Sequence, residues 1–183
     1  MSDNRTIIYL TSTTIFIWVI LFSAGLVVSS KPYLEQLSSG FSIGNFIIAS
    51  LTYTPSNIAI LSVLSGFIGG CISKLLGVDE IEARLAEALQ ANNENLINNL
   101  QRRKSYLMES PMLSMFRGFL TYVGVISGML LLISNPFEVT SSGQYIRIAG
   151  LISGLAFLMG YDPTQFEELI SRFSRWKTNT NNK

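Results

Sequence analysis

The sequence has no histidine and a single cysteine, Cys71, among its 183 residues. Without histidine, the chain has no imidazole base, no zinc site that uses histidine, and no catalytic arrangement of the Ser-His-Asp or Cys-His type. One cysteine cannot form a disulfide within the chain, and Cys71 lies inside an apolar run, where a thiol packs as a small hydrophobic side chain. Phosphate-binding loops, dinucleotide fingerprints and metal-ligand clusters are also missing from the sequence. We therefore expect no enzyme, no cofactor and no metal site.

Charged residues are scarce too. They make up 14% of the chain, compared with roughly a quarter in a soluble domain. In contrast, 48% of the residues are hydrophobic and the mean hydropathy is +0.37. The net charge of +1 provides no general attraction to nucleic acid, so we expect no nucleic-acid partner. This composition is typical of a protein whose main partner is the lipid bilayer.

Four segments have the length and the hydropathy of membrane-spanning helices. A hydrocarbon core takes about 20 helical residues to cross. We place the spans at about residues 7–29, 55–76, 112–134 and 145–161. The first has a longer apolar core than a signal peptide, so we interpret it as a retained span. The second has Thr54 as its expected N-cap and Pro55 at its first position. The sequence thus predicts an all-α polytopic integral membrane protein, with one membrane domain over residues 1–183.

The positions of the thirteen lysines and arginines predict how these spans are oriented. With four spans, only Lys31 and Arg147 fall on one side of the membrane. The other side receives Arg5, Lys74, Arg84, Arg102, Arg103, Lys104, Arg117, Arg172, Arg175, Lys177 and Lys183. Basic residues concentrate on the cytoplasmic side of membrane proteins. We therefore predict a multi-pass protein of the cell membrane with both termini in the cytoplasm, a partition that an odd number of spans would destroy.

Small residues recur four positions apart within the spans. The second span has Ser62, Gly66 and Gly70 on one stripe with Ser65 and Gly69 beside it, the third has Gly124 and Gly128, and the fourth has Gly150 and Gly154. In a bilayer, close backbone approach through small residues is a main reason for helices to associate. These stripes therefore predict helix contacts, either within one four-helix unit or between subunits around a pore. Asn57 is a further candidate for a polar pore lining or an interhelical hydrogen bond.

The connection between spans two and three, residues 77–110, has a helical periodicity of its own. Its apolar stripe consists of Val78, Ile81, Leu85, Leu89, Leu96, Leu100 and Leu107. Asparagines, which favour turns, cluster in the middle of the segment at Asn92–Asn95. We therefore predict a cytoplasmic helical hairpin that turns there. The alternative is an unbroken rod that docks on neighbouring subunits.

Charge supports this hairpin, because its first arm is acidic and its second arm is basic. A turn at the asparagines brings Glu82 near Arg103 and Asp79 near Tyr106. Each exposed ion pair contributes less than about 1 kcal/mol, but several pairs together favour one register. The basic residues of the second arm, Arg102, Arg103 and Lys104, are candidates for contacts with a cytoplasmic protein partner or with lipid.

Two further segments are short and apolar on one side. Residues 41–51 are too short to span a membrane, and we interpret them as an interfacial or packed half-helix, with a re-entrant pore segment as the alternative. Residues 163–177 predict an amphipathic helix in the membrane interface, with the packing of its apolar face on the hairpin as the alternative. The candidates for lipid or partner contact on that helix are Phe166, Phe173 and Trp176.

The predicted spans contain no aspartate or glutamate. Ion-coupled transporters usually keep an acidic residue near the middle of the membrane, whereas a channel can use hydroxyls, carbonyls and an apolar constriction. The first hypothesis is therefore a homo-oligomeric channel or pore-forming subunit with a regulatory hairpin. The second is a membrane anchor or assembly subunit that conducts nothing and recruits a soluble partner.

Overall fold

The computed structural model describes residues 2–28, 31–107, 110–132, 137 and 141–164, and every element in these ranges is helical. The helices are α1 (Ser2–Val27), α2 (Lys31–Ser39), α3 (Ile43–Thr52), α4 (Thr54–Gln90), α5 (Glu94–Leu107), α6 (Pro111–Leu132) and α7 (Ser142–Tyr161). The predicted all-α class is therefore confirmed for the described part of the chain. The predicted interfacial helix at 163–177, with Phe166, Phe173 and Trp176, lies outside the described residues except at its first two positions.

Within the described ranges, three helices are long and apolar enough to cross a membrane. They are Asn4–Val27 in α1, Thr54–Gly77 in α4 and Pro111–Leu130 in α6, close to the first three predicted spans. The helix at the fourth predicted span, α7, has 20 residues but is not among these three. It contains Gln144 and Arg147 in its first turns, which lower its hydropathy. The four-span count therefore remains a prediction.

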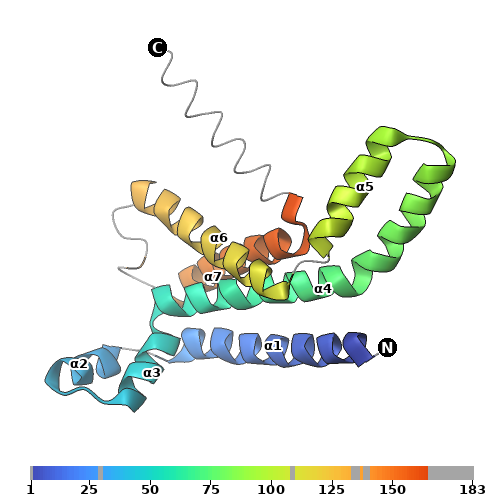
Figure 1. Cartoon of the computed structure of the whole chain (residues 1–183). Helices are drawn as coiled ribbons and strands as arrows, with labels where there is room; N and C mark the ends of the chain where they lie inside the picture. The colour runs from blue at the N-terminus through green and yellow to red at the C-terminus, as the bar shows by residue number, and fades with distance from the viewer. Residues whose placement is uncertain (1, 29–30, 108–109, 133–136, 138–140, 165–183) are drawn as a thin grey trace, which may run out of the picture.

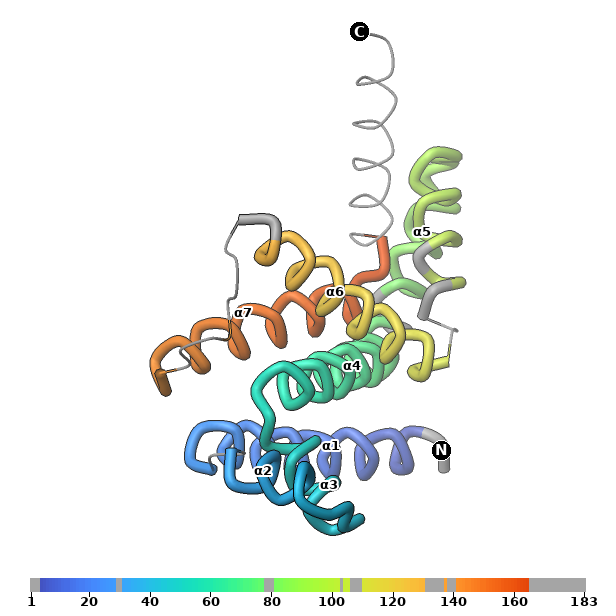
Figure 2. Tube along the Cα trace, turned by 90° about the vertical axis from the view of Figure 1, so that its left-hand side faces the viewer, coloured from blue at the N-terminus to red at the C-terminus, as the bar shows by residue number. Residues whose placement is uncertain are grey.

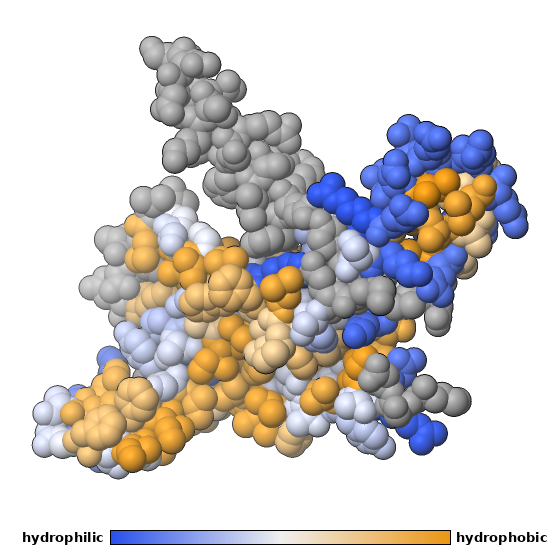
Figure 3. Space-filling view, in the orientation of Figure 1, coloured by the Kyte–Doolittle hydropathy of each residue, from blue (hydrophilic) through white to orange (hydrophobic). Residues whose placement is uncertain are grey.

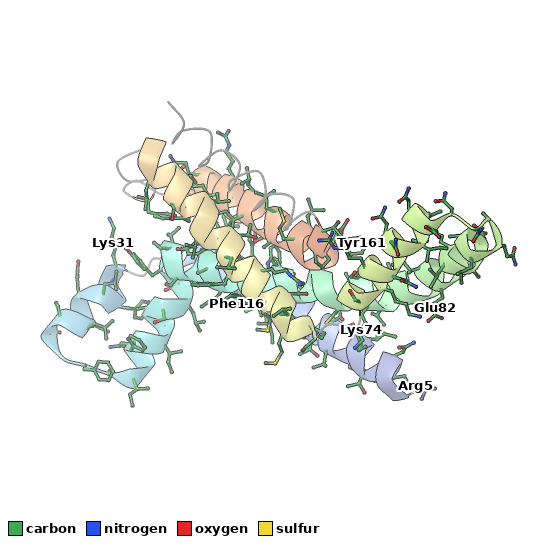
Figure 4. All side chains as sticks on the ribbon, turned by 45° about the horizontal axis from the view of Figure 1, so that its top comes forward. Arg5, Lys31, Lys74, Glu82, Phe116 and Tyr161 are labelled. Carbon is green, nitrogen blue, oxygen red and sulfur yellow. The ribbon has the colours of Figure 1, made fainter. Side chains whose placement is uncertain are left out.

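Helix α4 is the centre of the bundle, because α1, α6 and α7 all pack against its first half (Figure 1). Successive long helices run in opposite directions, so the start of α1, the α4–α5 hairpin and the end of α7 lie at one end of the bundle. Arg5, Lys74 and Tyr161 lie towards that end and Lys31 lies at the other (Figure 4). The helices α2 and α3 also lie at the Lys31 end.

The core of the bundle is small and its outer surface is apolar. The buried cluster consists of Leu21, Ile58, Leu61, Ile126, Tyr145, Ala149 and Ile152. Outside it, large hydrophobic side chains such as Phe16 on α1 and Met112 and Phe116 on α6 are mostly exposed, and hydrophobic residues cover much of the visible face in Figure 3. Soluble monomers rarely expose apolar patches of this extent. The surface suits a lipid environment.

Local sequence explains where α7 begins, whereas α4 begins without a side-chain cap. In α7, the backbone N–H of Gln144 donates to the Ser141 hydroxyl at 3.3 Å, and the Gln144 side chain accepts from the backbone N–H of Ser141 at 3.4 Å. This capping box starts the helix at Ser142, three residues before the predicted start. In α4, Tyr53 is the N-cap and makes no side-chain cap bond. The expectation that Thr54 would be the N-cap is therefore wrong by one residue.

Helix α4 continues without a break for 37 residues and leaves the bundle as the first arm of a hairpin with α5. The turn lies at residues 91–93, where Asn92 has a positive φ of 50°. Glu82 Oε1 accepts from Lys104 Nζ at 2.8 Å, an ion pair between the two arms next to the predicted neighbour Arg103, whose side chain lies outside the described part of the chain. Apolar residues from the two arms are buried: Ile81, Ala88 and Leu100.

The connection between α1 and α4 forms two short helices. Helix α3 covers most of the predicted 41–51 segment and is packed against α1 and α4 at their shared end. Its axis lies across the direction of α1 in Figure 1 and in the rotated view of Figure 2. A half-helix packed at the end of the bundle is therefore a better description than a segment that enters along the bundle axis.

Candidate functional site

The most polar contact of the bundle is built around Asn57, whose side chain is fully buried near the start of α4. Its amide nitrogen donates to the carbonyl oxygens of Leu21 in α1 at 3.0 Å and Leu51 in α3 at 2.6 Å. Its amide oxygen lies 2.6 Å from the hydroxyl of Tyr145 in α7. All the hydrogen-bonding groups of this buried amide thus have partners, as burial in an apolar medium requires.

Tyr145 completes this centre from the other side of the bundle. Its hydroxyl donates principally to Asn57 and lies 3.2 Å from the carbonyl oxygen of Phe22. Its ring packs on that of Phe22, at a centroid distance of 5.5 Å. Gly25 makes this approach feasible, because a Cβ at this position would lie 2.5 Å from Tyr145 Cζ. The centre therefore ties α1, α3, α4 and α7 together.

A second contact, between α4 and α6, consists of small residues. The Ser62 hydroxyl donates to the carbonyl oxygen of Gly118. A Cβ on Gly66 would lie 3.0 Å from Gly118 Cα, and one on Gly118 would lie 3.2 Å from Gly66 Cα. Both distances are too short for an unstrained Cβ, so the two backbones touch where neither helix has a side chain.

A third contact brings α7 against the same part of α4. A Cβ on Gly69 would lie 2.9 Å from the backbone nitrogen of Tyr161, and one on Gly160 would lie 3.0 Å from Gly66 Cα. A Cβ on Gly70 would lie 2.7 Å from Ser114 Cβ in α6. The stripe of small residues on α4 thus makes its contacts within one chain, where α4, α6 and α7 meet.

The other sequence candidates divide into two groups. Ser65 is buried within the bundle. In contrast, a Cβ on Gly124, Gly128, Gly150 or Gly154 would meet no atom of the described chain within 4 Å. These four glycines face away from the contacts described above. Their assignment to a contact between subunits or to a pore lining stays a prediction.

Several residues of these contacts were not identified from the sequence. They are Gly25, Ser114, Gly118, Tyr145 and Gly160. Ser114 and Gly118 have the same four-residue spacing as the α4 stripe, and so do Ala156 and Gly160. That spacing could have indicated them. No local signal pointed to Tyr145, because its partner Asn57 is 88 residues away in the sequence.

Two of the three basic candidates in the hairpin have side chains that the structure describes. Lys104 forms the ion pair with Glu82, Arg102 is exposed, and the side chain of Arg103 is outside the described part. At the tip of the hairpin, Leu89 and Leu96 are 58% and 44% exposed. Two leucines exposed to this degree beside a turn form an apolar surface with no cover in the described chain.

The described residues contain no group of three or more potential metal ligands. Comparisons of the chain with protein families, with curated proteins and with solved structures found no match.

Proposed function

We propose that this protein is a four-span membrane protein of the cell membrane, with α1, α4, α6 and the less apolar α7 as its spans. The alternation of helix direction supports this topology, because it brings the start of α1, the hairpin and the end of α7 to one end of the bundle. Arg5 and Lys74 lie towards that end and Lys31 lies at the other. Arg84, Arg102 and Lys104 belong to the two arms of the hairpin itself. By the positive-inside rule, the hairpin end is cytoplasmic.

Within this topology, we propose that the protein acts as a membrane anchor or assembly subunit whose hairpin docks a soluble partner. The observation that supports this proposal most directly is the unbroken α4 helix, which runs from the centre of the bundle into the hairpin over 37 residues. Buried Ile81, Ala88 and Leu100 hold α5 against it. The result is a projecting helical arm with Leu89 and Leu96 exposed near its tip. An apolar groove on a soluble protein is the matching partner surface.

A homo-oligomeric channel remains the second proposal. The specific observation in its favour is the open face formed by the α6 and α7 glycines, Gly124, Gly128, Gly150 and Gly154, which another copy of the chain could cover. Against it, the polar candidates Asn57, Ser62 and Ser65 are buried in contacts within one chain. A pore would therefore need a different lining.

The topology is tested by labelling single cysteines with a maleimide that cannot cross membranes, in a Cys71→Ala background. Asn4→Cys and Asn95→Cys, at the start of α1 and in the hairpin, should react from the cytoplasmic side only. Gly40→Cys, between α2 and α3, should react from the other side only. Reaction of Asn4→Cys and Gly40→Cys from the same side would contradict the placement of α1 as a span.

The two functions are separated by measuring partner capture and ion flux on the same full-length protein. For the anchor, Leu89→Asp combined with Leu96→Asp should abolish proximity labelling of a specific cytoplasmic protein in cells. The matched control, Asn99→Asp on the exposed side of α5, should leave that labelling unchanged. Ion flux across the membrane of vesicles that contain the purified protein would instead support the channel, if the double variant retains that flux.

A further inference from the structure

Helix α3 has an apolar surface that the bundle does not cover. Of its ten residues, only Ala49 and Thr52 are buried. Ile43 is 69% exposed and Phe46 is 50% exposed, and Phe41 just before the helix is 73% exposed. The rings of Phe41 and Phe46 pair at a centroid distance of 6.0 Å. One side of α3 thus rests on the bundle, and the other presents aromatic and branched side chains.

The orientation of α3 distinguishes it from the long helices. It lies across the axis of α1, at the end of the bundle that is opposite the hairpin (Figure 1). Ten helical residues measure about 15 Å, roughly half the hydrocarbon thickness, so α3 is too short to span. If α1 is parallel to the membrane normal, α3 lies in the plane of the membrane at its edge.

Helix α2 supplies the polar side of the same unit. The side-chain amide of Asn45 in α3 donates to the amide oxygen of Gln36 in α2 at 2.8 Å. No residue of α2 is buried. Lys31 and Glu35 are the only charged residues in the sequence from residue 31 to residue 53. The two helices therefore form an amphipathic unit that carries no net charge.

We propose that α3 inserts its exposed side into one membrane leaflet, the leaflet opposite the hairpin, at the boundary between headgroups and acyl chains. This inference depends on the proposed membrane topology. The surface that α3 exposes is continuous with the apolar outer side of α1, which would contact the acyl chains of the same leaflet (Figure 3). Because the α2–α3 unit has no net charge, the insertion is driven by apolar burial and requires no anionic lipid.

The test places an environment-sensitive fluorophore on single cysteines in the Cys71→Ala background, with the full-length protein in phosphatidylcholine vesicles. Labels at Phe46→Cys and Ile47→Cys should show blue-shifted emission and strong quenching by lipids with a spin label near the headgroup. A label at Ser38→Cys in α2 should behave as in water. A label at Phe16→Cys, in the middle of α1, should be quenched more strongly by a spin label deep in the acyl chains.

Four outcomes decide the proposal. Quenching at positions 46 and 47 that is unchanged by added phosphatidylglycerol would support it. Water-like emission at both positions, with position 16 in lipid, would overturn the insertion of α3 but leave the membrane topology intact. Water-like emission at position 16 would overturn the topology as well. The fourth outcome is a blue shift at positions 46 and 47 without quenching by the lipid spin labels. If that blue shift disappears when the protein is diluted into more lipid, a second copy of the chain covers the surface, and the proposal is overturned.

Discussion

The hydroxyl of Tyr145 in α7 lies 2.6 Å from the amide oxygen of Asn57 in α4, across 88 residues of sequence. The same asparagine side chain donates to the backbone of α1 and of α3. One residue thus connects four helices. An amide left without partners in an apolar interior is costly, so these bonds favour the one arrangement of the helices in which all of them form.

Replacing this tyrosine provides a direct measure of the polar centre. In Tyr145→Phe, the ring remains but the Asn57 oxygen loses its donor. We expect the free energy of unfolding in detergent to fall by about 1 kcal/mol, the usual size for hydrogen bonds between membrane helices. The matched control is Tyr9→Phe, on the exposed side of α1, which should change nothing. Equal stability of both variants would show that the hydrogen bond contributes nothing.

The contact of α4 with α6 predicts opposite results for two glycines of the same helix. In Gly118→Ala, the new Cβ would lie 3.2 Å from Gly66 Cα and closer still to the Ser62 carbonyl oxygen. We expect a loss of about 1–3 kcal/mol as the helices move apart. In Gly124→Ala, the Cβ meets nothing within 4 Å in the described chain, and alanine favours the helix by about 1 kcal/mol.

The measurement is the melting temperature of the purified protein in one detergent, which should fall for Gly118→Ala and stay the same or rise for Gly124→Ala. A leucine at position 124 adds a test of assembly. If the α6 face contacts another copy, Gly124→Leu should shift the oligomeric state without unfolding the chain. Unchanged mass in mild detergent would contradict an oligomer that uses this face.

The hairpin should depend on its apolar residues more than on its ion pair. Leu100 is 6% exposed, so Leu100→Ala should destabilise the arm by about 2–4 kcal/mol. Lys104 and Glu82 are 36% and 54% exposed, and Lys104→Ala should cost well under about 1 kcal/mol because water screens the pair. Hydrogen exchange of the α5 amides distinguishes the two variants. Similar losses of protection would show that the ion pair is as important as the apolar contact.

The turn of the hairpin predicts a sensitive position at Asn92. Its φ of 50° lies in the left-handed region, which asparagine and glycine tolerate and branched residues avoid. Asn92→Val should therefore destabilise the hairpin by about 1–2 kcal/mol, whereas Asn92→Gly should have little effect. Asn95→Val, within α5, is the control for loss of a polar side chain. Hydrogen exchange at the start of α5 is again the measurement.

Much of this architecture was predictable because it depends on local pattern. Hydropathy located three long apolar helices, and the asparagine cluster located the turn to within a residue or two. The turn occupies 91–93, at the beginning of the asparagine cluster 92–95, and Glu82 pairs across it with Lys104. Helix starts were less predictable, because the capping box at Ser141 extends α7 by three residues.

The contacts between helices were predictable in kind but not in detail. Four-residue spacing of small residues occurs on several faces, and it does not say which face meets which partner. Gly66 and Gly69 lie against α6 and α7. Gly124 and Gly150 also begin four-residue pairs, but a Cβ on either of them would meet no atom of the described chain within 4 Å. That difference depends on how α6 and α7 cross α4, and it arises only when the helices are assembled.

Residue order alone was enough to establish an all-helical chain with apolar helices of membrane length, because helix formation and hydropathy involve neighbours within a few turns. The choice of Asn57 and Tyr145 as partners, and of Gly118 and Gly160 as contact points, required the assembled bundle. Such pairs are separated by tens of residues, and only the packing of whole helices brings them within bonding distance.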